Sequence, residues 1–143
     1  MTTTTTQTEL VDRVWEEAFE NGELAVIDEA VASDYICHTP SDPAGVRGPE
    51  EFKAFVRTSR EAFPDLSVTV DDRIVGDDVV VDRYTMRGTH EGDFMGIVPT
   101  GNVFETTGIV IHYIEDGKIV KDLAEFDNLD TMAQLGVVEP PGV

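Results

Sequence analysis

Four side chains of this sequence carry a thiol or an imidazole, groups suited to nucleophilic attack, proton transfer or metal binding: the single cysteine, Cys37, and the histidines His38, His90 and His112. Cys37 stands next to His38, so a thiolate activated by an imidazole is one interpretation. We favour the alternative that Cys37 is a small buried apolar residue, as most free cysteines are. No cysteine–histidine spacing is typical of a zinc site, and one cysteine cannot form an internal disulfide. We therefore expect no metal, and chemistry based on histidine and carboxylate groups.

His112 and Asp122 flank a predicted β-hairpin whose turn lies at Asp116-Gly117. A two-residue turn would place His112 opposite Lys121. A three-residue turn with a glycine bulge would place His112 opposite Val120 and diagonal to Asp122. In that second register the imidazole and the carboxylate share one face of the hairpin, where the pair could exchange protons with a bound molecule. The alternative is an ion pair at the rim of the sheet, partly in solvent.

The apolar residues repeat with two different periods along the chain. Before Pro64 the spacing of three and four residues is typical of amphipathic helices, and after it apolar and polar residues alternate as in strands. The predicted elements are helices at 9–20, 24–33 and 49–63, a short extended piece at 35–39, a loop at 40–48, strands at 66–70, 79–90, 103–114 and 119–126, and a last helix at 128–135. We expect Asp127 to be the N-cap of that last helix and His90, in a glycine-rich turn, to serve the backbone. Helices followed by a meander of strands predict an α+β fold, with helices on one face of a curved, mostly antiparallel sheet.

The composition limits the domain count and the possible partners. The chain has 143 residues, 41% of them apolar, and 29 acidic against 10 basic residues give a formal net charge of −19. We expect one domain at 9–136, between a disordered tail at 1–8 and a C-terminal tail at 137–143. The charge opposes nucleic-acid and anionic-membrane partners; it would suit a cationic partner, but its even spread favours adaptation to high salt. No apolar segment could span a bilayer and the Thr-rich start lacks a signal-peptide pattern, so we expect a cytoplasmic protein.

Short motifs follow one another in order from residue 19 to residue 136. They are Phe19-Glu20-Asn21-Gly22, Asp34-Tyr35 with His38, Gly88-Thr89-His90-Glu91-Gly92, Pro99-Thr100-Gly101, Asp116-Gly117-Lys118-Ile119 and Gln134-Leu135-Gly136. This ordered set resembles the SnoaL-like polyketide cyclase (ester cyclase) family of the nuclear-transport-factor-2-like superfamily. The resemblance implies a cone-shaped α+β barrel around an apolar pocket, and aldol ring closure by acid–base catalysis without a cofactor.

The resemblance also implies where the reactive side chains of a cyclase would stand. The base falls at Ala124, an assisting histidine at Val110 and its polar neighbour at Gly108, none of which can transfer a proton. The resemblance favours the hairpin register in which Val110 and Ala124 face the pocket. In that register His112 and Asp122 become the candidate acid–base pair. Relatives often carry a pocket-facing histidine at the position of His38, which we expect to orient the ligand; a loop histidine with satisfied hydrogen bonds is the alternative.

Two hypotheses for the function follow. One is a cofactor-independent cyclase, isomerase or hydrolase that acts on a small apolar carbonyl compound or ester. The other is a binding protein for a small hydrophobic ligand that kept the pocket and lost the base at Ala124. The expected pocket walls are Trp15, Tyr35, Phe55, Phe94, Val110 and Ala124. The apolar outer-face residues Val79, Val81, Ile109 and Ile111 predict a homodimer, which is also common among relatives.

Overall fold

The computed structural model describes residues 3–138, in which four α-helices and one π-helical segment accompany six strands. The helices are α1 (Thr3–Arg13), which continues directly into the π-helical segment η1 (Val14–Glu20), then α2 (Ala25–Ala30), α3 (Gly48–Ala62) and α4 (Asn128–Gln134). The first helix begins at Thr3, within the segment 1–8 that was expected to be a disordered tail, and Gln7 of that segment is only 3% exposed. Most of the expected C-terminal tail, 137–143, lies outside the described residues.

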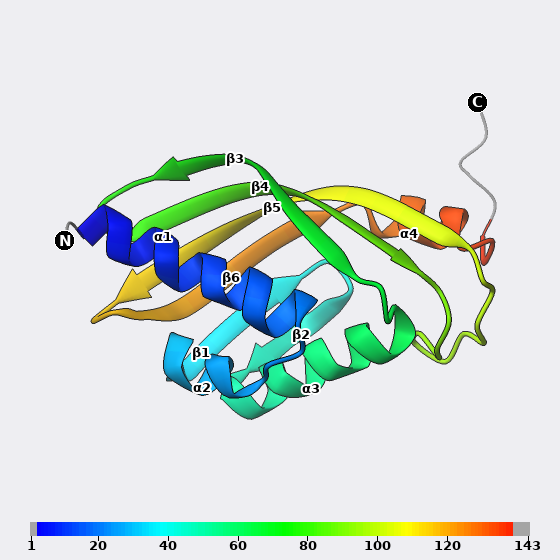
Figure 1. Cartoon of the computed structure of the whole chain (residues 1–143), viewed down its shortest axis with the longest axis horizontal. Coiled ribbons are helices and arrows are strands. Elements are labelled where there is room, and N and C mark those ends of the chain that lie inside the picture. The colour runs from blue at the N-terminus through cyan, green and yellow to red at the C-terminus, as the bar shows by residue number, and fades with distance from the viewer. Residues whose placement is uncertain (1–2, 139–143) are drawn as a thin grey trace.

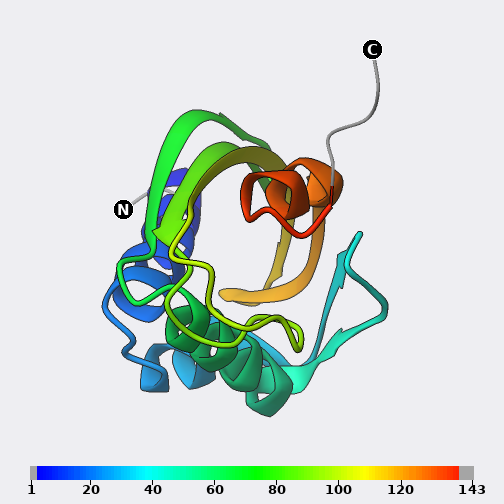
Figure 2. The same ribbon diagram turned by 90° about the vertical axis from the view of Figure 1, so that its right-hand side faces the viewer.

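All six strands belong to one sheet with two free edges. They are β1 (Val31–Thr39), β2 (Asp42–Arg47), β3 (Ser67–Val75), β4 (Val79–Thr89), β5 (Val103–Glu115) and β6 (Lys118–Phe126). The order across the sheet is β2-β1-β6-β5-β4-β3, and the pairs are antiparallel except for the parallel pair of β1 and β6. The sheet curves strongly, with α1, η1, α2 and α3 on its concave side (Figures 1 and 2). The predicted α+β architecture is confirmed.

Two boundaries differ from the sequence expectation in the segment that enters the sheet. Helix α2 ends at Ala30, and β1 begins at Val31, although helix was expected as far as residue 33. Residues 42–47, expected within a loop, form strand β2, which pairs with β1 through Cys37 opposite Val46. Proline and glycine in this segment masked the strand in the sequence, but both are tolerated at the edge of a sheet, where β2 lies.

The hairpin between β5 and β6 adopts neither of the two expected registers. Asp116 and Gly117, with φ of 51° and 76°, form a two-residue turn, and Glu115 pairs with Lys118. One extra residue, at Val120, then shifts the register, so that His112 lies directly opposite Asp122. The pair is therefore closer than the diagonal arrangement that the sequence predicted.

The core lies between the helices and the concave face of the sheet. In β5, alternate residues from Phe104 to Ile114 point inward, which places Val110 and His112 on the buried face. From the helical side, η1 contributes Trp15 and Phe19. Helix α4 begins at the predicted cap, because the Asp127 Oδ1 accepts a hydrogen bond from the Asp130 amide at 2.9 Å.

Candidate functional site

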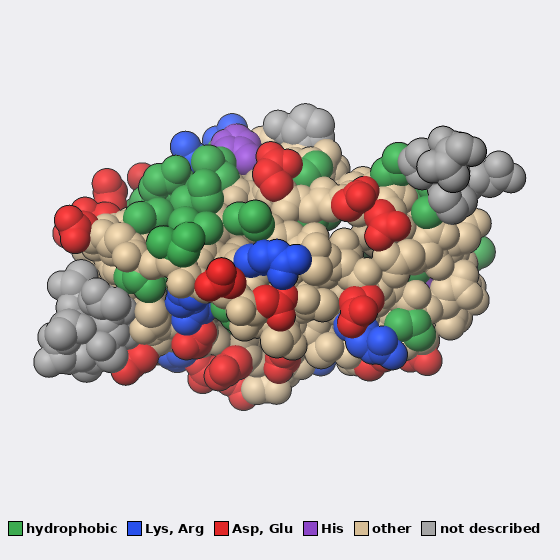
Figure 3. Space-filling model, turned by 90° about the horizontal axis from the view of Figure 1, so that it is seen from above, with side chains coloured by type: hydrophobic (Ala, Val, Ile, Leu, Met, Phe, Trp, Pro, Cys, Tyr) green, Lys and Arg blue, Asp and Glu red, His purple; other side chains and the backbone are tan. Residues whose placement is uncertain are grey.

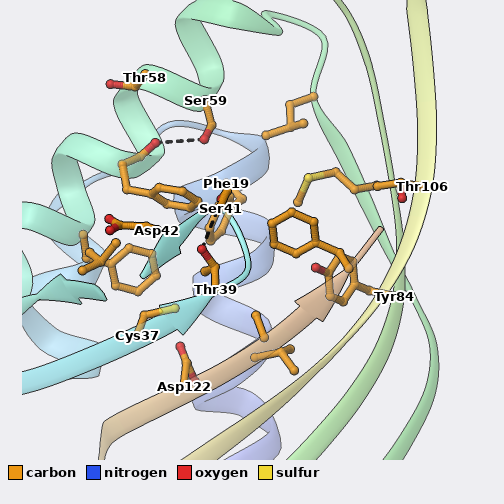
Figure 4. A pocket seen from close by; sticks show the side chains of 18 of the residues that line it. Phe19, Cys37, Thr39, Ser41, Asp42, Thr58, Ser59, Tyr84, Thr106 and Asp122 are labelled. Atoms are coloured by element: carbon orange, nitrogen blue, oxygen red, sulfur yellow. Dashed lines mark hydrogen bonds between the residues drawn. The ribbon is translucent and has the colours of Figure 1, made fainter. Parts of the chain in front are cut away.

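A cavity of about 340 Å³ opens between the helices and the inner face of the sheet (Figure 4). Its walls are mostly apolar and include every wall residue expected from the sequence: Trp15, Tyr35, Phe55, Phe94, Val110 and Ala124. Polar side chains from β1, the β1–β2 turn, β2, α3, β5 and β6 are set among them: Thr39, Ser41, Asp42, Thr58, Ser59, Thr106 and Asp122. A mainly apolar cavity with a few polar groups is the usual form of a small-molecule site.

Asp122 is the centre of a buried hydrogen-bonded group on the cavity wall. Its Oδ1 lies 2.6 Å from His112 Nδ1, and its Oδ2 accepts a hydrogen bond from the Tyr35 hydroxyl at 2.6 Å. The three residues come from β6, β5 and β1, and each is at most 5% exposed. Asp122 thus has both oxygens engaged, yet it remains part of the cavity lining.

A second carboxylate, Asp82 on β4, holds the other side of the His112 ring. His112 Nε2 lies 3.3 Å from Asp82 Oδ2, and the same oxygen accepts a hydrogen bond from Trp15 Nε1 at 3.0 Å. Arg73 on β3 donates to both Asp82 oxygens, at 2.6 and 3.0 Å. Arg73 also pairs with the surface residue Asp12 on α1 at 2.8 Å, so a chain of charged groups connects the cavity wall with solvent.

The two flanking carboxylates determine the charge of His112. Burial by itself would lower the pKa of His112, but the attraction and hydrogen bonds of Asp122 and Asp82 raise the pKa to about 9. Burial would likewise raise the pKa of Asp82, but hydrogen bonds from His112, Arg73 and Trp15 hold the pKa well below its ordinary value. At neutral pH His112 is therefore an imidazolium whose two N–H groups both point at carboxylates.

Two further titratable side chains near Asp122 stay protonated. Burial, followed by the negative charge of Asp122, raises the pKa of the Tyr35 phenol well above its ordinary value. The same two causes raise the pKa of the Cys37 thiol to about 12. Cys37 lines the cavity and pairs with Asp122 across the parallel strands, but a thiol with this pKa is not a nucleophile at neutral pH.

The other two histidines do not line the cavity. Tyr35, Cys37 and Thr39 of β1 face the cavity, and the alternation of the strand turns His38 to the opposite side. The expected role of His38 as a ligand-orienting donor is therefore not supported by its position. His90 is fully buried, and its Nδ1 lies 3.0 Å from the Thr100 hydroxyl and 3.3 Å from the Thr100 amide.

Sequence reasoning missed Asp82, Arg73 and Tyr84, although one signal was present. Val80, Asp82 and Tyr84 are alternate residues of β4 and all face inward. A charged residue at such a position needs a buried partner. Arg73 gave no comparable signal, because its partner lies on a neighbouring strand and not on its own.

Neither a metal cluster nor a membrane-spanning helix occurs in the described part of the chain. No three histidine, cysteine or acidic side chains among residues 3–138 gather in an arrangement that could hold a metal ion. None of the helices in that range combines the length and the apolar character that crossing a membrane would require.

Comparison with known proteins agrees with this geometry. The SnoaL-like polyketide cyclase model matches residues 9–135. The chain is 27% identical over 124 residues to the aklanonic acid methyl ester cyclase AcmA of Streptomyces galilaeus, with 84% of each chain covered. Among solved structures, a candidate SnoaL-like polyketide cyclase from Jannaschia sp. CCS1 has a TM-score of 0.87 at 26% identity, covering 99% of this chain and 97% of the other.

A further solved structure, TsrD from Streptomyces laurentii, is 31% identical with a TM-score of 0.83, covering 94% of this chain and 97% of the other. The family model thus spans nearly the whole chain. The solved structures share the cone-shaped arrangement of helices and sheet that surrounds the cavity of this protein. On this evidence the protein belongs to the SnoaL-like polyketide cyclase family.

Proposed function

We propose that this protein is a cofactor-independent acid–base catalyst of the cyclase type, which acts on a small apolar carbonyl compound held in the cavity. In the proposed step the Asp122 carboxylate removes a proton from the carbon beside the ligand carbonyl, and the C–H electron pair moves into an enolate. The enolate can then attack a second carbonyl, as in aldol cyclisation, or be protonated again, as in isomerisation. Hydrolysis of an ester, with Asp122 activating a water molecule, is a related possibility for the same site.

The observation that carries this proposal is the buried set of Asp82, His112 and Asp122 on an otherwise apolar wall. Both N–H groups of His112 are directed at carboxylates, so this ring has no proton free for a ligand. His112 and Asp122 both line the cavity, and Asp122 is the one that can accept a proton there. His112 then serves to orient Asp122 and to balance its charge, as an orienting partner does in other acid–base sites.

A non-catalytic binding protein is the alternative function for the same cavity. Ala124 and Val110 line the cavity at the positions where the family resemblance implies the cyclase base and its assisting histidine. A protein that kept the cavity and lost these groups would bind a small hydrophobic molecule without converting it. The Asp122 proposal differs from this hypothesis in requiring turnover.

The test is Asp122→Asn, assayed on the small molecule that co-purifies with the protein and is identified by its mass. We expect turnover to fall about 10²- to 10⁴-fold, the usual contribution of a general base, because an amide cannot accept the proton. The matched control is Glu125→Gln, which removes one charge from an exposed position of the same strand. Equal turnover of Asp122→Asn and the control would refute Asp122 as the base. No turnover even by the unsubstituted chain would favour the binding hypothesis.

We further propose that the protein works as a homodimer in a salt-rich cytoplasm. An apolar patch covers the outer face of β3, β4 and β5 (Figure 3), where Ile74 is 67% and Ile109 is 48% exposed. The rest of the patch consists of Val79, Val81, Ile111 and Tyr113. Such a patch on a chain with a net charge of −19 suits self-association once salt screens the repulsion. Light scattering in molar KCl should report a dimer at micromolar concentration, and a monomer would contradict this proposal.

A further inference from the structure

The cavity contains a second phenol, Tyr84, whose hydroxyl has no protein partner. Tyr84 projects from β4 into the cavity, and it is only 5% exposed (Figure 4). The Tyr35 hydroxyl donates a hydrogen bond to Asp122. In contrast, the Tyr84 hydroxyl makes no hydrogen bond with any side chain or backbone group of residues 3–138. Buried tyrosine hydroxyls usually find a partner, so a free one on a cavity wall indicates that the partner is the bound molecule.

Gly108 creates the space in which this hydroxyl lies. Gly108 is paired with Tyr84 across β4 and β5, and it lies at an inward-facing position of β5. A Cβ atom at Gly108 would stand 2.5 Å from the Tyr84 oxygen and 2.9 Å from the Glu125 carbonyl oxygen. Any side chain at 108 would therefore displace the phenol. The polar group that the family resemblance implies at position 108 is absent, and a hydroxyl from the neighbouring strand occupies the same place.

Tyr84 is also suited to donate its proton and not to lose it. Burial, with a smaller effect from Cys37, raises the pKa of the Tyr84 phenol to about 12, so the hydroxyl stays protonated at neutral pH. The other aromatic and imidazole donors of the cavity wall are already engaged: Trp15 with Asp82, His112 with Asp82 and Asp122, and Tyr35 with Asp122. Among these groups in the described chain, the Tyr84 O–H is the one left for a ligand.

We propose that Tyr84 is a second catalytic residue, which donates its O–H to the ligand carbonyl oxygen and stabilises the negative charge that develops there. The inference rests on the proposed function. When Asp122 takes the proton, the C–H bond breaks, an O–H bond forms on the carboxylate, and the electron pair moves through a conjugated ligand onto the carbonyl oxygen beside Tyr84. Such a ligand spans the four residues of β5 between Gly108, opposite Tyr84, and His112, opposite Asp122. Return of the proton reverses these changes. A donor placed where charge develops, in a cavity with little water, is an effective form of electrostatic catalysis.

The test uses two probes of nearly the same shape, 2-acetonaphthone and 2-isopropenylnaphthalene, in which a C=CH₂ group replaces the carbonyl. Binding is measured by equilibrium dialysis to the unsubstituted protein, to Tyr84→Phe and to the control Tyr113→Phe, whose phenol lies on the outer face of the sheet and is 37% exposed. Tyr84→Phe should weaken binding of the ketone by about 2- to 10-fold, the usual contribution of one hydrogen bond, and leave the hydrocarbon within about 2-fold. Tyr113→Phe should change neither.

A spectroscopic measurement makes the test independent of affinity. The ¹³C resonance of a labelled carbonyl moves downfield on hydrogen bonding, so bound 2-acetonaphthone should resonate downfield of its position in hexane and move upfield in Tyr84→Phe. A hexane-like shift in the unsubstituted protein would overturn the inference even if Tyr84→Phe failed to fold.

The remaining outcomes separate this inference from the proposed function. Equal weakening of both probes by Tyr84→Phe would assign Tyr84 to packing and overturn the inference alone, since the role of Asp122 does not depend on it. Failure of the unsubstituted protein to bind either probe would overturn the inference. It would also overturn the proposal that the ligand is a small apolar carbonyl compound. Loss of ketone binding in Tyr84→Phe with full turnover in Asp122→Asn would support the donor and refute the base.

Discussion

Two buried histidines of this protein, His112 and His90, have opposite surroundings. His112 is 4% exposed and lies between the carboxylates of Asp82 and Asp122, with hydrogen-bonding distances on both nitrogens. His90 is 0% exposed and packs among aromatic rings, with centroid distances of 5.6 Å to Phe63 and 6.2 Å to Phe94. Its Nδ1 contacts Thr100, and its Nε2 has no hydrogen-bond partner in the described residues.

The difference shows that burial alone does not give a histidine charged partners. His112 stands in the middle of a strand, where its neighbours on β4 and β6 can each supply a carboxylate. His90 stands where a strand gives way to a loop, and its contacts hold that loop: the His90 amide donates to the Asn102 carbonyl, and the Gly101 amide donates to the His90 carbonyl. Charged partners hold the His112 ring, whereas packing and backbone hydrogen bonds hold His90. Mutation and unfolding measurements can test this difference.

The largest effect is expected from Asp82→Ala. This substitution removes a fully buried carboxylate and leaves His112, Arg73 and Trp15 without their shared acceptor. Removing one partner of a buried ion pair costs about 3–5 kcal/mol of unfolding free energy, because the other charge stays buried and unpaired. Urea unfolding at pH 7 measures the loss. The control is Asp12→Ala at the half-exposed end of the same chain of charges, expected to cost no more than about 1 kcal/mol. If both variants lost a similarly small amount of unfolding free energy, Asp82 would not be the shared acceptor that stabilises this buried group.

The second effect is a dependence of stability on pH that His112 confers. The pKa of His112 rises from 6.5 to about 9 on folding. A raised pKa stabilises the folded state fully below pH 6.5, and this contribution is lost as the pH rises through 9. The whole contribution is on the order of 3 kcal/mol. Urea unfolding between pH 6.5 and 9.5 should follow this decline, and ¹⁵N spectra of His112 should show both nitrogens protonated at pH 7. Stability that increases across this window would contradict the imidazolium assignment.

The smallest effect is expected from His90→Leu. Leucine places an apolar side chain among the phenylalanines, removes the unpartnered Nε2, and deprives the Thr100 hydroxyl and amide of their Nδ1 partner. The loss of these part-buried hydrogen bonds should cost about 1–2 kcal/mol of unfolding free energy. Thermal unfolding at pH 7 measures the loss. A loss as large as that of Asp82→Ala would contradict the assignment of His90 to packing and backbone contacts.

Local patterns in the sequence were sufficient for the α+β fold and for the face on which several key residues lie. The alternation of β5 predicted that Val110 and His112 point the same way, and the acidic residue before the last helix predicted the Asp127 cap. Both predictions use a period or a spacing within about ten residues, which the backbone geometry of one element determines. The helix at Thr3 and the strand β2 were missed, since their stability comes from packing and pairing with distant segments.

The composition of the site was decided by contacts between residues far apart in the chain. Tyr35 and Asp122 are separated by 87 residues, and Trp15 and Asp82 by 67. The extra residue at Val120 brings His112 directly opposite Asp122, and the missing side chain at Gly108 makes room for the Tyr84 hydroxyl. Periodicity along one strand specifies which face a side chain occupies but not which strand lies beside it. The sequence by itself therefore determined the family and many of the inward-facing residues, and the strand order of the folded sheet decided which of them meet.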